Sequence, residues 1–361
     1  MRQADPVKRL LICLIAIVVL TGGCTQPDTA TVSPTPAPAR HSSYTLPIPE
    51  RSFYIGLVPS PRTIPPTTFE DITAAYEEAG GIAEASMVWV SPQGIGQYDK
   101  LKQNNVVTAL RVYGIKPVIT LGFATIRQVP GEGLKYVIDA PAGVNADLSD
   151  PGFRRLWVDE ARKIAGELKP EYFSLGNEIN DYFYLHPGEL DDYLSLYDEA
   201  YAAIKDASPG TKVFVVFSYD HVIENSQYDM LRQFDSRSDL IGLTTYPWQR
   251  YDAPGDIPGD YYARLNSYVD KPLAFTEIGW ASSGSGSEKE QAEFLVKFLE
   301  LTRGNEVEMV SWLFLHETPL TGDLASIARP ETGTISLKYA DGSKKEVYGV
   351  WLDVHGLKLK R

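Results

Sequence analysis

Short apolar segments alternate with longer amphipathic ones from Arg51 onward, and this alternation constrains the fold more than any other feature. Most of the short segments are continuous apolar runs, as parallel strands covered on both faces should be. The strand candidates are residues 53–57, 86–90, 117–123, 172–175, 212–218, 239–245, 272–276 and 309–315. Helical spacing of apolar residues fills the intervals between them. The sequence therefore predicts an α/β fold with a parallel sheet.

Several predicted helices begin at recognisable capping residues. Asp150 is a good N-cap and is followed by proline at the first helical position. Ser287 and Glu290 form a capping box ahead of an apolar helical repeat. Thr68 begins another helix, and two more are expected over residues 189–205 and 345–352.

Eight strands interleaved with helices match a (β/α)₈ TIM barrel. The alternative is a doubly wound open sheet, which more often carries a Gly-rich phosphate-binding turn after its first strand. Here that turn reads Gly56-Leu57-Val58-Pro59-Ser60-Pro61, with the wrong glycine spacing and two prolines. We therefore predict the barrel, as a single catalytic domain over residues 51–361.

The first residues have the composition of an export signal. Lys8 and Arg9 precede an apolar run over residues 10–20, and small residues precede Cys24. Small residues before a cysteine also resemble a lipoprotein lipobox, in which Cys24 becomes the acylated first residue. The alternative is an uncleaved membrane anchor. We expect residues 1–23 to be a lipoprotein signal peptide, and the protein to be extracytoplasmic and anchored to a membrane through lipid on Cys24.

Residues 24–50 are rich in Pro, Thr and Ser, including the run Ser33-Pro34-Thr35-Pro36-Ala37-Pro38. Such a segment lacks the apolar content needed to fold and is typical of an extended linker. It would hold the domain away from the membrane surface.

Charge and cysteine content exclude several functions. The formal net charge is −13, which disfavours nucleic acid and anionic polymers as partners and favours a neutral substrate. The two cysteines, Cys13 and Cys24, both precede the domain, so disulfides and cysteine-ligated metals are excluded there. The five histidines are scattered without paired metal-ligand spacing. We expect no metal, no cofactor and a monomer.

Two glutamates stand where strands should end. Glu178 closes Gly176-Asn177-Glu178, and Glu277 lies in Thr276-Glu277-Ile278. Glu is depleted in strands and is rarely buried unless paired. In a barrel both carboxylates would lie at the same C-terminal face. Cleavage of a glycosidic bond requires at least two such carboxyl groups in one site. For either residue alone, the competing interpretation is a solvated carboxylate in a loop.

The segments around these glutamates, residues 175–180 and 275–280, resemble clan A of the glycoside hydrolases, most closely families 53 and 5. The resemblance implies a general acid/base at Glu178 and a nucleophile at Glu277. It also implies that Asn177 hydrogen-bonds the 2-hydroxyl of the sugar, and that Tyr246 contacts the nucleophile. A tyrosine at the barrel rim is the alternative interpretation of Tyr246.

Aromatic rings near strand ends are candidates for stacking on the apolar faces of a sugar. The candidates are Trp280, Trp248, Trp89 and Trp312, although each ring alone is more often core or rim packing. His221 and His316, also at strand ends, are candidates for polar sugar contacts.

These features predict a retaining glycoside hydrolase that acts on a β-linked neutral poly- or oligosaccharide through a two-carboxylate double displacement. One alternative is a non-catalytic, cell-surface carbohydrate-binding barrel, which has no reason to keep both glutamates. The other is an envelope-glycan transglycosylase, which would use the same residues with a sugar acceptor in place of water.

Overall fold

The computed structural model describes residues 41–63, 68–89, 96–129, 131–319 and 328–360. The predicted signal peptide, the lipidation site Cys24 and most of the predicted linker lie outside these residues. Among the helices of the described part, none is long and apolar enough to cross a lipid bilayer.

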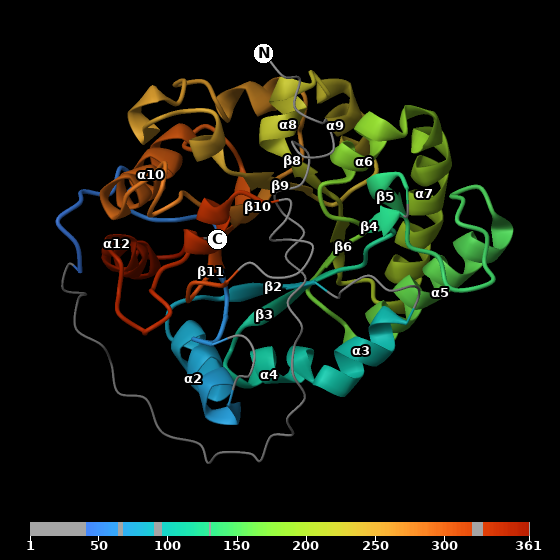
Figure 1. Ribbon diagram of the computed structural model, residues 1–361, viewed down its shortest axis with the longest axis horizontal. Helices are drawn as coiled ribbons and strands as arrows, with labels where there is room; N and C mark the ends of the chain where they lie inside the picture. Colours follow the sequence, from blue (N-terminus) through green and yellow to red (C-terminus); the bar gives the residue numbers. More distant parts are fainter. Residues whose placement is uncertain (1–40, 64–67, 90–95, 130, 320–327, 361) are drawn as a thin grey trace.

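A closed parallel sheet forms the centre of the domain (Figure 1). Its strands are β1 (Tyr54–Val58), β2 (Ala85–Trp89), β3 (Lys116–Thr120), β6 (Tyr172–Ser174), β7 (Lys212–Phe214), β8 (Val216–Ser218), β9 (Ile241–Thr245), β10 (Leu273–Ile278) and β11 (Val307–Phe314). They follow the order β7-β6-β3-β2-β1-β11-β10-β9-β8. Only Val215 separates β7 from β8 along the chain, so the two ends of this order belong to one interrupted strand. The sheet therefore closes on itself, and the predicted barrel is confirmed.

Helices surround the strands as an outer ring (Figure 1). They are α2 (Phe69–Gly80), α3 (Gln97–Asn104), α4 (Val106–Val112), α5 (Pro151–Leu168), α6 (Ile179–Leu185), α7 (Leu190–Ala207), α8 (Tyr219–Glu224), α9 (Tyr228–Asp235), α10 (Glu288–Leu301) and α12 (Glu346–His355). The predicted caps are present. The Asp150 side chain accepts hydrogen bonds from the backbone of Gly152 and Phe153, and Ser287 accepts from the backbone of Glu290.

The connection from β9 to β10 carries 3₁₀ turns where a barrel would usually place an α-helix. These turns are η2 (Pro247–Gln249), η3 (Pro254–Asp256) and η4 (Ala263–Ser267). Two of them, η2 and η3, begin with proline, whose fixed φ suits the first residue of a helical turn. The other short turns are η1 (Pro187–Glu189) and η5 (Pro330–Thr334).

A two-stranded antiparallel hairpin follows β3 and was not predicted. It pairs β4 (Ala124–Val129) with β5 (Gly133–Ile138). The predicted strand over residues 117–123 is accordingly too long, since β3 ends at Thr120. Gly131 and Gly133 both have φ near +80° at the hairpin turn, a conformation that glycine adopts without strain. Their position between two alternating segments is the signal that could have identified the hairpin.

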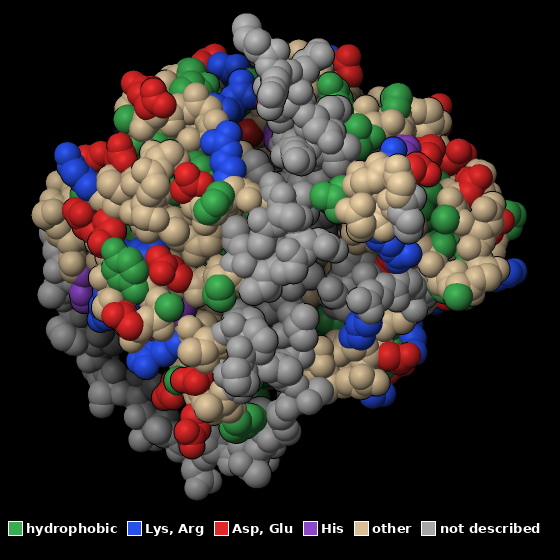
Figure 2. Space-filling model, in the orientation of Figure 1, with side chains coloured by type: hydrophobic (Ala, Val, Ile, Leu, Met, Phe, Trp, Pro, Cys, Tyr) green, Lys and Arg blue, Asp and Glu red, His purple; other side chains and the backbone are tan. Residues whose placement is uncertain are grey.

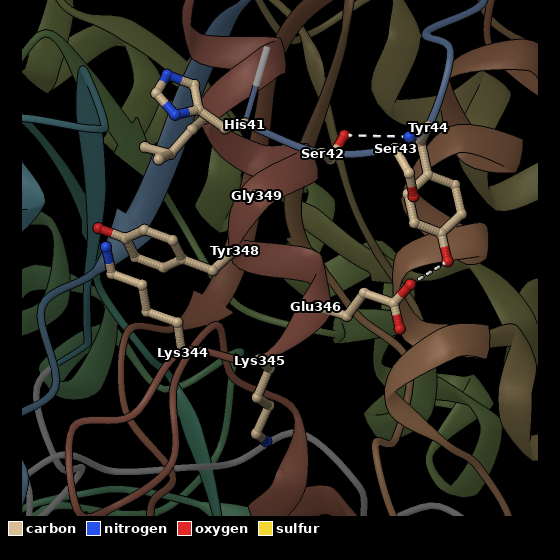
Figure 3. Close-up of a pocket in the computed structure, with 10 residues that line it drawn as sticks. His41, Ser42, Ser43, Tyr44, Lys344, Lys345, Glu346, Tyr348 and Gly349 are labelled. Atoms are coloured by element: carbon tan, nitrogen blue, oxygen red, sulfur yellow. Dashed lines mark hydrogen bonds between the residues drawn. The ribbon is translucent and has the colours of Figure 1, made fainter. Parts of the chain in front are cut away.

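The first described residues pack along α12 (Figure 3). Asp353 accepts hydrogen bonds from the backbone N–H groups of His41 and Ser42, at 2.7 and 3.0 Å. The Tyr44 hydroxyl donates to Glu346 at 2.7 Å. These contacts line a surface pocket beside α12 that contains neither Glu178 nor Glu277.

Acidic and basic side chains are interspersed over the outer helices on the face shown in Figure 2. The described acidic side chains visible on this face therefore do not gather into a single patch.

Candidate active site

Glu178 lies in a tight turn between β6 and α6. Gly176 has φ +137° and Glu178 has φ +49°, so this turn uses positive φ values at two of three consecutive residues. A Cβ atom on Gly176 would lie 2.6 Å from Cγ2 of Ile179, so no larger residue fits there without a shift. A positive φ at a non-glycine residue is uncommon and often marks a functional position. The turn leaves Glu178 only 5% exposed.

Glu277 reaches the site because of a β-bulge in β10. Phe275 pairs with Leu243 and Glu277 pairs with Thr244 of the neighbouring strand β9. Thr276 lies between them and has no partner in β9, so it is the extra residue of the bulge. The Phe275 ring packs outward against Phe298 of α10, with ring centroids 4.8 Å apart. Regular alternation would turn Glu277 to that same outer side, and the extra residue reverses its direction.

The C-terminal end of β9 and the residue that follows it bind the two carboxylates. The Thr244 hydroxyl donates to Oε1 of Glu178, and the Tyr246 hydroxyl donates to Oε2 of Glu277 at 2.7 Å. The Asn177 amide also donates to Oε1 of Glu277, at 3.3 Å. Thr244 lies in β9, and Tyr246 is the first residue after this strand. These contacts bring the two glutamates, which the sequence placed at separate strand ends, into one site.

The two carboxylates have different surroundings. Burial raises the pKa of Glu178 well above its ordinary value, and the negative charges of Asp181 and Glu277 raise it further. The Thr244 hydroxyl and His221 oppose this rise. Glu277 instead receives two hydrogen bonds, from Tyr246 and Asn177, which favour its ionised form. The surroundings of Glu178 therefore favour its protonated form, whereas those of Glu277 supply hydrogen-bond donors to its carboxylate.

Behind Glu178 lie two buried aspartates that the sequence analysis missed. Nδ1 of His221 is 2.9 Å from each carboxylate oxygen of Asp181. Asp220 accepts a hydrogen bond of 2.6 Å from the backbone N–H of Tyr246 and another from the Tyr261 hydroxyl. Asp220 thus fixes the start of the loop that carries Tyr246. Thr244 was missed as well, although its two-residue spacing from Tyr246 could have identified it.

Two of the predicted sugar-stacking residues are placed elsewhere. Trp280 and Trp312 are both 0% exposed. Each ring packs on Phe294 of α10, with centroid distances of 5.4 and 6.3 Å, and Trp312 also contacts Trp351 of α12. The predictions for Trp280 and Trp312 are therefore corrected, because rings enclosed by the helix layer cannot stack on a sugar.

The other two predicted tryptophans lie at or just after strand ends. Trp248 lies in η2, two residues after Tyr246, and the Arg329 guanidinium is 5.7 Å from the centre of its ring. Trp89 ends β2 and is partly exposed. Oδ1 of Asn177 and the indole nitrogens of both tryptophans are buried without a hydrogen-bond partner in the described residues. A bound polar ligand would satisfy such groups.

His316 is 3% exposed, and its Nδ1 lies 2.7 Å from the Ser60 carbonyl. This contact joins the ends of β11 and β1. A structural role therefore explains His316 without a sugar contact.

Comparison with known proteins identifies the fold. No protein-family model and no curated protein sequence matches the chain. Among solved structures, it is similar to the exo-β-1,4-mannosidase Op5Man5 from Opitutaceae bacterium strain TAV5, with 14% identity, a TM-score of 0.65, and coverage of 85% of this chain and 59% of that one. The chain therefore has a (β/α)₈ barrel fold similar to that of this structure.

Two further structures support the same fold. A family 39 glycoside hydrolase from the gut symbiont Bacteroides cellulosilyticus WH2 is 18% identical, with a TM-score of 0.57 over 84% of this chain and 63% of that one. The GH5_18 protein from Streptomyces cattleya, in complex with Manβ1-4GlcNAc, is 14% identical, with a TM-score of 0.63 over 84% and 80%. The chain thus spans less than two thirds of the length of the mannosidase and of the family 39 protein. At these identities the likeness is one of fold.

Proposed function

We propose that the protein is a retaining glycoside hydrolase acting on a β-linked neutral poly- or oligosaccharide. The observation that carries the proposal is the pairing of Glu178 and Glu277. They are buried carboxylates with contrasting surroundings, bound by Thr244 and Tyr246 at the C-terminal end of β9. A pair of this kind can supply one proton donor and one nucleophile.

In this proposal, Glu277 attacks the anomeric carbon while Glu178 gives its proton to the leaving oxygen. The products of this step are the free leaving sugar and a covalent glycosyl-enzyme. Glu178, now ionised, takes a proton from a water molecule that attacks the same carbon and releases Glu277. Each glutamate returns to its starting state. A retaining pair requires carboxyl groups about 5–5.5 Å apart. Asn177, the residue next to Glu178, donates to Glu277 at 3.3 Å.

The unpartnered Oδ1 of Asn177 would accept the hydrogen bond of the sugar 2-hydroxyl. Its amide nitrogen already holds Glu277, so one side chain would position both the nucleophile and the sugar. Among the predicted aromatics, Trp248 and Trp89 remain the candidates for contact with sugar rings.

The test is a substrate screen followed by substitution of each carboxylate. β-Mannosides and manno-oligosaccharides are tested first, because one similar structure is an exo-β-1,4-mannosidase and another is a complex with Manβ1-4GlcNAc. Galactan, glucan and xylan are tested next. Glu277→Ala should abolish turnover. Glu178→Ala should keep residual activity on substrates with good leaving groups, and azide should restore more. Glu293→Ala, on the outer face of α10, is the matched control.

Each contrary outcome has a distinct meaning. Equal rates for the parent and both variants would overturn the assignment. An inverted anomer as the first product, detected by NMR, would overturn the retaining mechanism. Sugar binding without cleavage would favour the carbohydrate-binding barrel, and products longer than the substrate would favour the transglycosylase.

We also propose that the domain is held outside the cytoplasm by a lipid on Cys24 and by the linker that follows it. The contacts of His41 and Ser42 with Asp353 would then fix where the linker leaves the domain. Cys24→Ser should release the protein from the membrane fraction, whereas an unchanged distribution would contradict lipid anchoring.

A further inference from the structure

A buried ion pair lies directly behind the proposed proton donor. Asp181 is in the first turn of α6, three residues after Glu178, and its side chain is 2% exposed. His221 reaches it from α8 through Nδ1, at 2.9 Å from both carboxylate oxygens. The His221 side chain is 14% exposed. Two helices that follow different barrel strands thus meet at this pair.

Neighbouring polar groups hold the pair in place. Asn180 donates to Asp181 at 3.3 Å and to Gln227 at 3.1 Å. The Asn180 side chain also accepts a hydrogen bond of 2.8 Å from the backbone of Ser218, the last residue of β8. Because α8 begins at the next residue, this contact fixes His221 relative to α6. Asn180 thus holds Asp181 directly and holds the start of the His221 helix through Ser218, so the fold fixes the geometry of the pair.

Several charged and titratable groups surround Glu178 and the pair. They are Asp181 on α6, Glu277 on β10, Tyr136 on β5, His221, Asp220 and Glu224 on α8, and Arg250 after η2. Most are acidic, and all except Glu224 and Arg250 are mostly buried. An excess of buried acid requires protons or a cation to compensate it.

The positions of the protons follow from these contacts. Burial by itself lowers the pKa of His221, but the charge and hydrogen bond of Asp181 raise it to about 9. Burial raises the pKa of Asp181, and His221 offsets part of that rise. The arrangement therefore favours a charged His221 at neutral pH, and a Glu178 that keeps its proton to a higher pH than an ordinary glutamate.

We propose that Asp181 and His221 are a positioning pair that sets the protonation of Glu178, with Asp181 holding the proton on Glu178 and His221 limiting that effect. The inference rests on the proposed function, in which Glu178 is the proton donor. Asp181 acts more strongly on Glu178 than His221 does, so the pair as a whole keeps the donor protonated. Neither residue needs to touch the substrate.

The test uses two substitutions of nearly unchanged shape. Asp181→Asn removes the negative charge, and His221→Asn removes the positive charge while keeping an N–H group near the position of Nδ1. The Glu178 carboxyl carbon is followed by ¹³C NMR as a function of pH in the full chain without substrate, and is assigned with Glu178→Gln. The alkaline limb of kcat/KM is measured beside it. His355→Asn, on α12, is the matched control.

The two variants should shift the titration midpoint of Glu178 in opposite directions. We expect Asp181→Asn to lower it by about one pH unit or more and His221→Asn to raise it, with the alkaline limb of kcat/KM following each shift. His221 also loses charge in Asp181→Asn, which offsets part of the fall. Unmoved midpoints, or shifts in the same direction in both variants, would overturn the inference. If Asp181→Asn does not fold, His221→Asn alone tests the sign.

The outcome for the pair can be separated from the outcome for the function. If hydrolysis depends on Glu178 but neither variant shifts the titration midpoint of Glu178, the proposed role of the pair is wrong and the proposed function is supported. Opposite shifts in a protein that cleaves no glycoside would support the pair and overturn the function.

Discussion

The Asn177 amide lies 3.3 Å from the carboxylate of Glu277, and the two residues follow strands that are not neighbours in the sheet. Asn177 follows β6 and Glu277 is the second-last residue of β10, so this hydrogen bond spans the mouth of the barrel. Glu178 is the residue next to Asn177. A displacement of the β6 turn would therefore disturb both carboxylates at once.

Tyr246→Phe should lower kcat/KM by about 10- to 100-fold, because a hydrogen bond to a charged group contributes about 1.5–3 kcal/mol. The hydroxyl lost is the one 2.7 Å from Glu277. Tyr262→Phe is the matched control, since its buried hydroxyl contacts Thr245 at 3.1 Å and no carboxylate of the site. Steady-state kinetics of both variants test this prediction. Equal losses in the two would show that the Tyr246 contact has no special role.

Gly176→Ala should destabilise the fold by about 2 kcal/mol or more, because alanine is strained at φ +137° and its Cβ would crowd Ile179. Gly188→Ala is the control, since a Cβ there meets nothing within 4 Å. Guanidinium unfolding measures both effects. A Gly176→Ala variant as stable as the control would mean that the turn before Glu178 relaxes easily.

Trp312→Phe should reduce stability by about 1–3 kcal/mol without changing KM, because the ring fills space between β11 and the outer helices. Thermal unfolding and kinetics on the same sample separate the two effects. Trp248→Phe provides the contrast, since Trp248 remains a candidate sugar contact and should affect KM more than stability. A raised KM with unchanged stability in Trp312→Phe would restore its predicted sugar contact.

Stability should fall as the pH rises from about 6.5 to 9. The pKa of His221 is raised to about 9 in the folded protein, from an ordinary value near 6.5. Because this pKa is raised by folding, the protonated His221 stabilises the folded state fully below pH 6.5, and this stabilisation is lost as the pH rises through 9. The loss in the free energy of unfolding is up to about 3 kcal/mol. Unfolding midpoints across this range test the slope. In His221→Asn the slope should flatten, and an unchanged slope would assign it to other groups.

The sequence alone determined the architecture, because its signals are local. Buried parallel strands read as continuous apolar runs, and caps such as Asp150 and Ser287 act on backbone groups within three residues. Thus the strands, the main helices and the barrel could be predicted. The two carboxylates could be named as well, since a glutamate directly after an apolar strand is conspicuous against that background.

Only the tertiary structure decided which groups meet. The bulge at Thr276 turns Glu277 inward. The residues 275–277 do not by themselves indicate a bulge, because a bulge exists only relative to the partner strand. Asp181 and His221 are 40 residues apart and meet only when α6 and α8 come together. Trp312 faces the helices because of the register of β11, which the local sequence does not specify. The direction of a side chain depends on register and packing partners, which a single chain segment does not contain.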